Sequence, residues 1–400
     1  MSVVIVGAGH AGLALSRELT RAGVEHVILE RAQIGQSWRT RWDSFCLVTP
    51  NWTVQLPGRP YDGDDADGFM PRDEIVTYLE DYAERIQAPV RLGIDVSSVE
   101  SASDGRFLLR TSDGDIETES VVLASGAYQR PHRPRGAGSL PEHIYAIDSE
   151  AYTSPGDLPP GKVLVVGSGQ TGCQVAEELN ESGRDVTLAC GRAPWAPRRI
   201  EGRDIVSWIN QTPFFEQKPS DLPSPAARLG ANVQASGRDG GHDLHYRTLA
   251  KKGVSLAGRF VEVEEDTVVF ADDLAASVAF GDARYADIGN LIRKSCLEQG
   301  ETPPEIPPAE PFDYEGRDRM DLDGCGAVIF TSGFRPDFTS WVHFTNAFDE
   351  FGFPIQTDGA STVVPGLYFM GMHFLRQRKS ATFLGAGVDA PVVAAEIAAH

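Results

Sequence analysis

The stretch Val3-Val4-Ile5-Val6-Gly7-Ala8-Gly9-His10-Ala11-Gly12 opens the chain and decides its fold. A short apolar run ends in the pattern G-x-G-x-x-G, and a helical pattern follows from Leu13. Gly7 allows the tight turn after the strand, Gly9 lets the backbone approach a pyrophosphate, and Gly12 lets the helix pack closely on the strand. The helix N-terminus then offers free N–H groups and the positive end of its dipole to the phosphates. The pattern therefore predicts a dinucleotide site.

A second apolar run, Val27-Ile28-Leu29, ends in Glu30, which lies 18 positions after Gly12. An acid at this place accepts hydrogen bonds from a ribose 2′-OH. A lone glycine pattern is weak support, but here strand, turn, helix, strand and acid follow in the order that a dinucleotide fold needs. Glu30 and the adjacent Arg31 are therefore candidate cofactor-binding residues.

The composition bounds the class of protein. A chain of 400 residues predicts two domains, at about 100–200 residues each. The net charge of −21 argues against a nucleic-acid partner and against an anionic membrane surface. The five cysteines are scattered, odd in number and without a C-x-x-C pair, which indicates a reducing compartment and no dithiol redox centre. With no signal peptide and no apolar run long enough to span a bilayer, we expect a cytoplasmic protein.

The opening pattern recurs after a Pro/Gly-rich linker at 152–161. The apolar run at 163–166 leads into a second glycine-rich turn, and another strand is expected at 186–190. The position of Glu30 is taken by Cys190, so this copy lacks the ribose acid. The candidate cofactor-binding residues of the second turn are Gly167, Gly169, Gln170, Thr171 and Gly172.

Arg192 lies two residues after Cys190, and Arg198 and Arg199 follow. A guanidinium binds a 2′-phosphate with charge-assisted hydrogen bonds, whereas an acid would repel it. The second site is therefore predicted to take NADP, with Arg192 and Arg199 as candidate binding residues. The alternative is that these are surface arginines beside a structural repeat.

Three apolar runs end in small residues. The run at 121–124 precedes Ser125-Gly126, and the run at 328–330 precedes Thr331-Ser332-Gly333. These two near copies suggest two places where the backbone must pass close to something. A third strand, from Gly366, ends at Gly371.

Other elements are expected from periodicity. A helix with one apolar face is expected after Pro71, and further helices are expected at 286–299 and 388–399, the last opened by Gly385-Ala386-Gly387. The polar and aromatic segment at 34–44 falls where a dinucleotide fold turns back over its cofactor. It holds Ser37, Trp38 and Trp42, and the two tryptophans either pack in the protein or shelter a ring system.

Two nucleotide folds in one chain, the first followed by G-x-S-W-x-x-R-W-D at 35–43, resemble the flavin-containing monooxygenases. The chain is most similar to the short bacterial branch of that superfamily, and the resemblance covers nearly its whole length. It rests on the following segments: Gly7 to Gly12 with Glu30, Ser37 to Asp43, Ala124 to Gly126, Gly167 to Gly172 with Arg192, Thr331 to Asp337, and Gly366 to Gly371.

The resemblance implies an α/β fold with two Rossmann-like dinucleotide-binding domains, the NADPH domain (158–312) being inserted in the FAD domain (1–157 and 313–400). It implies FAD in the first site and NADPH in the second. Gly371 and the following segment would close over FAD, and the C-terminal helix would point its N-terminus at the isoalloxazine. NADPH would reduce FAD, O2 would add to give a flavin hydroperoxide, and a substrate N, S or carbonyl carbon would be oxygenated.

The chain departs from the family at one motif. The fingerprint F-x-G-x-x-x-H-x-x-x-(Y/F/W) would end at Tyr152, but Asp148 stands at the histidine position and the F-x-G is missing. This departure weakens the case for monooxygenation more than the case for FAD or NADPH. The family's asparagine near the flavin corresponds to Asn51, so Asn51 and Asp148 are the candidate catalytic residues.

Three functions stay open. The first is an NADPH-dependent flavin monooxygenase acting on a small soft nucleophile or a ketone, with O2 and a small organic substrate as partners. The second is an NADPH-dependent flavin reductase or electron-transfer protein without a dithiol, and the third is a catalytically silent nucleotide-binding sensor. A homodimer is compatible with the sequence. The polar segment at 373–380 is either a solvated loop or a contact to the nicotinamide nucleotide or to an acidic substrate.

Overall fold

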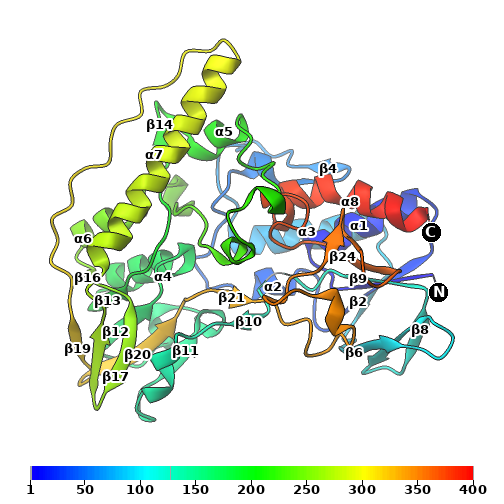
Figure 1. Cartoon of the computed structure of the whole chain (residues 1–400), viewed down its shortest axis with the longest axis horizontal. Coiled ribbons are helices and arrows are strands. Elements are labelled where there is room, and N and C mark those ends of the chain that lie inside the picture. The colour runs from blue at the N-terminus through cyan, green and yellow to red at the C-terminus, as the bar shows by residue number, and fades with distance from the viewer. Residues whose placement is uncertain (1, 127, 400) are drawn as a thin grey trace.

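The computed structural model describes residues 2–126 and 128–399. Two sheets, the first mostly parallel and the second wholly parallel, form the centres of two α/β units, which lie side by side along the long axis of the molecule (Figure 1). The predicted fold class is thereby confirmed. The helices are α1 (His10–Arg21), α2 (Gln36–Arg39), α3 (Arg72–Arg85), α4 (Gln170–Glu181), α5 (Ile205–Asn210), α6 (Tyr246–Lys252), α7 (Leu274–Glu298) and α8 (Phe383–Ala398).

The first sheet has the strand order β22-β23-β24-β9-β1-β2-β5. Its strands are β1 (Val3–Val6), β2 (His26–Glu30), β5 (Val90–Leu92), β9 (Ser120–Leu123), β22 (Gln356–Thr357), β23 (Ala360–Ser361) and β24 (Leu367–Phe369). β1 pairs in parallel with β2 and β9, so Val4 lies between Val27 and Val121. Such a strand is buried on both faces, which explains its unbroken apolar run.

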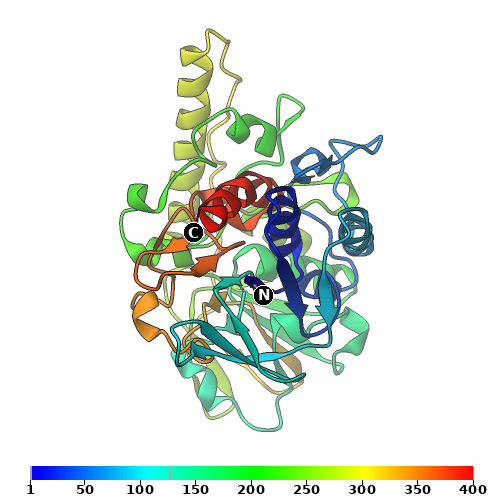
Figure 2. The ribbon, with the colours of Figure 1, turned by 90° about the vertical axis from the view of Figure 1, so that its right-hand side faces the viewer.

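Helices cover one face of the first sheet and a small antiparallel sheet covers the other. Apolar side chains of α1, α3 and α8 form one core, and α1 and α8 lie side by side (Figure 2). The opposite core takes side chains from β6 and β7 and from the segment 338–353. The antiparallel strands are β6 (Val96–Ser101), β7 (Phe107–Thr111) and β8 (Ile116–Thr118).

The second sheet has the order β11-β20-β12-β13-β16, and all its strands are parallel. The strands are β11 (Ala146–Asp148), β12 (Lys162–Val166), β13 (Val186–Ala189), β16 (Ser255–Ala257) and β20 (Cys325–Phe330). α4 and α6 pack on one face, and the antiparallel strands β17 (Phe260–Glu264), β18 (Thr267–Phe270) and β19 (Arg319–Asp321) lie against the other. The same three layers therefore occur twice in the chain.

The second sheet draws strands from outside the central part of the chain. β11 precedes residue 158 and β20 follows residue 312, yet both belong to this sheet. β20 lies between β11 and β12, so it is an inner strand. The domain boundaries expected from the sequence stay a prediction, but this sheet extends past both ends of 158–312.

Several contacts join the two units. β10 (Arg130–Pro131) and β21 (Phe334–Arg335) form a two-stranded antiparallel ribbon. Trp42 packs in the core of the second unit, and the fully buried Arg198 donates to the carbonyl oxygen of Val48 at 2.9 Å. The remaining strands are β3 (Gln55–Leu56), β4 (Arg59–Pro60), β14 (Arg199–Ile200) and β15 (Arg203–Asp204).

Two helices begin earlier than their sequence pattern predicts. α7 begins at Leu274 rather than 286, because its first half packs through small residues; a Cβ on Gly281 would lie 2.9 Å from Cδ1 of Trp195. α8 begins at Phe383, so Gly385 and Gly387 lie inside it. They permit close packing, since a Cβ on Gly387 would lie 2.1 Å from the carbonyl oxygen of Gln55. Within 2–126 and 128–399, no helix is both long and apolar enough to cross a membrane.

Candidate dinucleotide sites

The two glycine-rich turns are built in the same way. Gly7 has a φ of 111° and Gly167 a φ of 105°, a region that favours glycine. A Cβ on Gly7 would lie 2.6 Å from the carbonyl oxygen of Ala124, and one on Gly167 would lie 2.8 Å from that of Thr331. The segments that pass close to the first glycines are therefore the two near copies, Ala124-Ser125-Gly126 and Thr331-Ser332-Gly333. Each turn is thus closed by a strand from a distant part of the chain.

The third glycine of each turn packs against the first. A Cβ on Gly12 would lie 2.1 Å from the carbonyl oxygen of Gly7, and one on Gly172 would lie 1.9 Å from that of Gly167. No side chain fits at either position without moving the backbone. This is the close helix–strand packing that the sequence predicts.

The middle glycines face open space instead. A Cβ on Gly9 meets no described atom within 4 Å, and one on Gly169 meets only Cβ of Ala231, at 3.8 Å. Gly9 has φ −81° and ψ −179°, which any residue adopts. The protein itself therefore does not require glycine here. A ligand that lies on the turn would require glycine at this position. The open space at both middle glycines therefore fits a pyrophosphate at each turn.

Glu30 ends β2 beside the first turn. Its carboxylate accepts hydrogen bonds from the backbone N–H of Ala8 at 2.9 Å and of Ala32 at 3.0 Å. These bonds fix the carboxylate at the edge of the turn and use two of its roughly four acceptor sites, so a ribose hydroxyl can still be accepted. The neighbouring Arg31 is exposed, and its role at the cofactor stays a prediction.

Trp38 lies against the start of α8. Its ring stacks on Phe383 at a centroid distance of 5.3 Å, and its Nε1 is buried with no hydrogen-bond partner in 2–126 or 128–399. A buried indole N–H normally finds an acceptor, so this donor fits a ligand atom. Ser37 is exposed next to it. Trp42 is 3% exposed and packs in the core of the second unit. Of the two alternatives for this residue, packing in the protein or sheltering a ring system, its position favours packing.

His10, which sequence reasoning did not single out, links the first turn to the C-terminal helix. Its ring lies 4.8 Å from that of Phe383, and its Nε2 is 3.2 Å from the carbonyl oxygen of Ala381. Burial lowers the pKa of His10 to about 4, so it is neutral at pH 7. It occupies a variable position of G-x-G-x-x-G, so no sequence pattern marks it. The contact brings the N-terminus of α8 to the first turn, and the expectation that this helix end points at the isoalloxazine stays a prediction.

The small residues that follow the strands lie beside the turns. Gly371 has a φ of 73°, and a Cβ there would lie 2.6 Å from Cβ of Ala11 in α1. The Oγ of Ser125 accepts a hydrogen bond from Gln129 at 3.0 Å, and the Oγ of Ser332 donates to the carbonyl oxygen of Val166 at 3.0 Å. Gly126 and Gly333 have positive φ angles of 91° and 85°. Direct cofactor contacts of these residues stay a prediction.

At the second turn the structure separates the three arginines. Arg192 is exposed, its Cζ lies 5.9 Å from the ring of Phe280, and it forms no ion pair with any described residue. Arg198 is instead buried, paired with Asp204 at 2.5 Å. Arg199 donates to the carbonyl oxygens of Gly240 and Gly241 at 2.7 and 2.9 Å. Arg192 therefore has the free guanidinium that a 2′-phosphate needs.

The other polar residues of the second turn hold a neighbouring loop. Gln170 exchanges hydrogen bonds with the backbone of Ala235, accepting from its N–H at 3.0 Å. Thr171 is partly buried in the first turn of α4. Both remain predicted cofactor residues.

The two candidate catalytic residues are held by protein groups. Asn51 is 5% exposed; its Nδ2 donates to the carbonyl oxygen of Asp65 at 2.9 Å, and its Oδ1 accepts from the N–H of Met70 at 2.6 Å. Asp148 forms a two-point ion pair with Arg133 at 2.8 and 2.9 Å. Both side chains thus have structural partners, which the sequence does not reveal, and their catalytic roles stay predictions.

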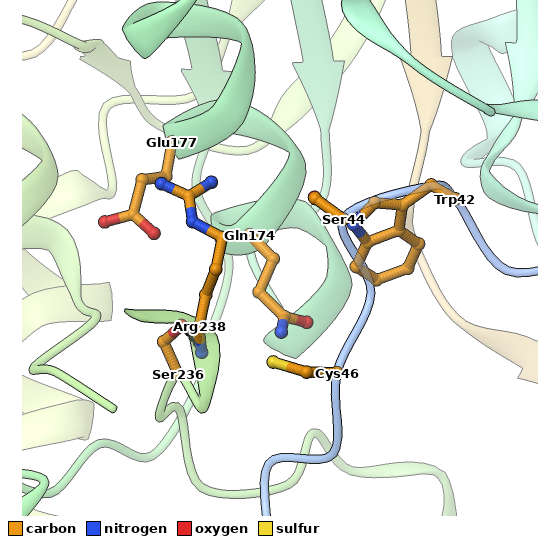
Figure 3. A pocket seen from close by; sticks show the side chains of 7 residues that line it. All are labelled: Trp42, Ser44, Cys46, Gln174, Glu177, Ser236 and Arg238. Atoms are coloured by element: carbon orange, nitrogen blue, oxygen red, sulfur yellow. Dashed lines mark hydrogen bonds between the residues drawn. The ribbon is translucent and has the colours of Figure 1, made fainter. Parts of the chain in front are cut away.

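A small polar cavity lies between the two units. Trp42, Ser44 and Cys46 line it from the first unit, and Gln174 and Glu177 of α4 from the second (Figure 3). Ser236 and Arg238 complete its lining. Its volume of about 10 Å³ has room for roughly one water molecule. The cavity is therefore part of the interface between the two units and is too small to be a substrate site. We call this interface, lined by Trp42, Ser44, Cys46, Gln174, Glu177, Ser236 and Arg238, the seam.

Glu177 is the buried charge of this seam. It is 1% exposed and meets His242 at 2.9 Å and Lys252 at 2.7 Å. Burial alone would raise the pKa of Glu177, but the hydrogen bonds from His242 and Lys252 outweigh it and lower the pKa. The hydrogen bond to Glu177 raises the pKa of His242 above 6.5.

We expect Glu177→Gln to lower the free energy of unfolding by about 1.5–3 kcal/mol, the worth of hydrogen bonds to a charged group. Because the folded pKa of His242 is raised, its contribution is complete below pH 6.5 and is lost as pH rises through the folded value. Urea unfolding should therefore show a larger gap between wild type and variant at pH 6 than at pH 8.5. In a His242→Gln background, the loss of unfolding free energy caused by Glu177→Gln should no longer depend on pH. If this loss is the same at pH 6 and pH 8.5 when His242 is present, the pairing of Glu177 with His242 is contradicted.

The cysteines do not form a redox centre. All five are free, and Cys46, Cys173, Cys190 and Cys296 are buried. Burial raises the pKa of Cys46 to about 11 and also raises the pKa of Cys173, Cys190 and Cys325. Since the thiolate is the nucleophile, the raised pKa values of these four thiols make them poor nucleophiles near neutral pH.

Comparisons with known proteins agree with this geometry. Residues 4–217, more than half of the chain, match the family described as pyridine nucleotide-disulphide oxidoreductase. An uncharacterized CzcO-like oxidoreductase of Geobacillus kaustophilus is 30% identical over 100% of this chain and 99% of its own length. An indole-3-pyruvate monooxygenase of Arabidopsis thaliana is 30% identical over 98% of this chain and 89% of its own length.

A solved structure shows the same fold. A flavin-containing monooxygenase from Stenotrophomonas maltophilia superposes with a TM-score of 0.69 at 19% identity, covering 100% of this chain and 98% of that one. Flavin monooxygenases and pyridine nucleotide-disulphide oxidoreductases use FAD and NADPH, which confirms the two cofactors predicted from the sequence. The chain belongs to the pyridine nucleotide-disulphide oxidoreductase family and to the flavin-containing monooxygenase superfamily.

Proposed function

We propose that the chain is an FAD-dependent, NADPH-using monooxygenase that oxygenates a small organic substrate at nitrogen, sulfur or a carbonyl carbon. The duplicated glycine-rich turn carries this proposal. Both turns have an open middle glycine, but only the first has a ribose acid, Glu30, while the second has a free arginine, Arg192. One site is thus suited to FAD and the other to NADPH.

The residues present fit both cofactors. Gly9, Glu30 and the unpaired Nε1 of Trp38 would hold FAD, and Gly169 with Arg192 would hold NADPH. Bound FAD supplies the redox and oxygen chemistry, and the protein positions the reactants and excludes water.

A loop of the second unit covers the segment before α8. The N–H of Arg378 donates to the carbonyl oxygen of Gln217 at 2.8 Å, and Lys379 pairs with Glu216 at 2.8 Å. This cover lies next to the N-terminus of α8, which contacts the first glycine-rich turn through His10. It would keep bulk water from the reacting atoms.

A flavin reductase without a dithiol is the second candidate. The position of the fingerprint histidine is occupied by Asp148, whose two carboxylate oxygens are both engaged by Arg133. This position therefore lacks a free acid–base group. Disulfide reduction is disfavoured, because the cysteines of the chain are scattered and four of them have raised pKa values.

Reduction and oxygenation can be separated in one experiment. The protein reconstituted with FAD should be bleached by one equivalent of NADPH without oxygen, and in air it should oxidise NADPH slowly and release H2O2. With ¹⁸O2 and a panel of a sulfide, an amine and a ketone, one product should carry one ¹⁸O atom. Rapid reduction of ferricyanide with no labelled product would favour the reductase, and no bleaching at all would favour the nucleotide sensor.

A further inference from the structure

Two arginines beside the proposed flavin site have no acidic partner among the described residues. The Nε of Arg41 is buried without a hydrogen-bond partner, and Arg41 forms no ion pair within 2–126 and 128–399. Arg378 donates to the neutral Oε1 of Gln217 at 2.6 and 3.1 Å. The basic residues on either side of Arg378 differ: Arg376 pairs with Asp358 and Asp389, and Lys379 pairs with Glu216. In a chain with a net charge of −21, two sheltered guanidinium groups left uncompensated need an explanation.

Tyr128 and His373 connect the two arginines. The Oη of Tyr128 lies 2.9 Å from Nε2 of His373, and the Cζ of Arg41 lies 5.5 Å from the ring of Tyr128. On the other side, the Cζ of Arg378 lies 4.8 Å from the ring of Phe374, the residue that follows His373, and the charge of Arg378 helps to lower the pKa of His373. Tyr128 is 49% exposed, so the group is open to solvent at this point. We call these four side chains the Arg41–Arg378 group; none of them forms an ion pair with a carboxylate within 2–126 and 128–399.

The electrostatics of this group favour an anion. Desolvation lowers the pKa of Arg41 and of Arg378, and burial together with Arg378 lowers the pKa of His373 to about 4. Tyr128 and the exposed Glu150 raise the pKa of Arg41 only in part, and neither forms an ion pair with it. Each of these groups is thus less favourable as a cation than it is in water. A bound anion would reverse this, because an opposite charge favours the charged form.

Aromatic rings flank the charged groups. The Cζ of Arg378 lies 4.4 Å from the ring of Phe214 and 4.8 Å from that of Phe374, and the ring of Phe334 lies 5.3 Å from that of Tyr128. Free phosphate would gain little from these rings, whereas an organic acid can place its carboxylate on the guanidinium groups and its apolar part on the rings.

The place of the group in the chain points to substrate. Arg41 follows Trp38 by three residues, and His373 follows Gly371 by two, so both lie on segments next to the first glycine-rich turn. The cofactor phosphates already have candidate donors in the two turns and in Arg192.

We propose that Arg41 and Arg378, with Tyr128 and His373 between them, bind the carboxylate of the substrate, which is then an organic acid with an apolar or aromatic part. This inference rests on the proposed function and narrows its substrate class. It assigns the polar segment at 373–380 to substrate binding rather than to a solvated loop.

The test uses the full chain loaded with FAD and two probes of the same shape, phenylacetate and phenylacetamide. Binding is followed by the flavin difference spectrum. Phenylacetate should bind at least tenfold more tightly than phenylacetamide. Arg378→Gln and Arg41→Gln should each weaken the binding of phenylacetate by roughly 10- to 100-fold. The binding of phenylacetamide should weaken by less than about twofold. Arg130→Gln, which removes an exposed charge already paired with Asp337, should change the binding of neither probe. If Arg378→Gln does not fold, the binding of both probes is measured with Arg41→Gln and Arg378→Lys instead.

Cofactor phosphates are tested in the same variants. The inference requires that the FAD content and the affinity for NADP⁺ stay within about twofold of wild type. A loss of FAD or of NADP⁺ affinity without a change for phenylacetate would overturn it, because the anion would then be a cofactor phosphate. Equal binding of the two probes by wild type would overturn it too. If the wild type prefers phenylacetate but no product carries ¹⁸O, the proposed monooxygenase function is wrong and the inferred carboxylate site still stands.

Discussion

Gly9→Val should give a folded protein that purifies without FAD. The middle glycine of the first turn has no described atom within 4 Å of an added Cβ, and its backbone angles suit any residue, so the fold has room for the side chain. The side chain would instead occupy the place of the pyrophosphate. The ratio of flavin to protein absorbance should fall from near one FAD per chain to below about a tenth, while the far-UV circular dichroism stays that of the apo wild type.

Gly12→Ala is the matched control for this prediction. Its Cβ would lie 2.1 Å from the carbonyl oxygen of Gly7, so it should lower the thermal stability of the apoprotein as well as the flavin content. The pair separates a ligand role from a packing role within one turn. A Gly9→Val protein with full flavin content would show that the first turn is not the FAD site.

Arg192→Ala should raise the KM for NADPH by roughly 10- to 100-fold and leave that for NADH almost unchanged. The two cofactors differ only in the 2′-phosphate, and a hydrogen bond to a charged group is worth about 1.5–3 kcal/mol, or roughly tenfold in affinity per 1.4 kcal/mol. Salt should reduce the effect, since Arg192 is exposed. Steady-state kinetics with both cofactors at low and high ionic strength provide the measurement.

Arg199→Ala serves as the control, because Arg199 is also exposed but donates to the carbonyl oxygens of Gly240 and Gly241. It should leave the preference for NADPH within about threefold of wild type. If Arg192→Ala weakens both cofactors equally, Arg192 is structural. A wild-type preference for NADH would show that the second site is misread.

The sequence predicted the parts of the fold that depend on local patterns. The strands at 3–6 and 163–166, the two glycine-rich turns and Glu30 are determined by short stretches in which apolar runs, glycines and an acid follow a fixed order. The same residues predicted a dinucleotide at the first turn and NADP at the second, and the resemblance to the flavin-containing monooxygenases implied that the first dinucleotide is FAD. The similarity of Ala124-Ser125-Gly126 to Thr331-Ser332-Gly333 also had a physical cause, since each closes one turn.

What the sequence did not show depends on distant partners. The pairing of Asp148 with Arg133, the burial of Arg198 against Asp204 and the missing partner of Arg41 depend on how the folded chain packs, which no short sequence pattern records. The early start of α8 was missed because its glycines suggest a helix boundary, whereas in the fold they allow close packing.

The closure of each turn by a late strand has a consequence for synthesis on the ribosome. The second glycine-rich turn needs Thr331, and the first sheet needs β24 (Leu367–Phe369) and α8. Neither unit can be completed until residue 330 has left the exit tunnel, which takes roughly 15 to 65 s at 5–20 residues per second. Once β9 and β12 have been made, the edges that β24 and β20 will cover stay open until those strands follow, and an open edge can pair with another copy of the chain.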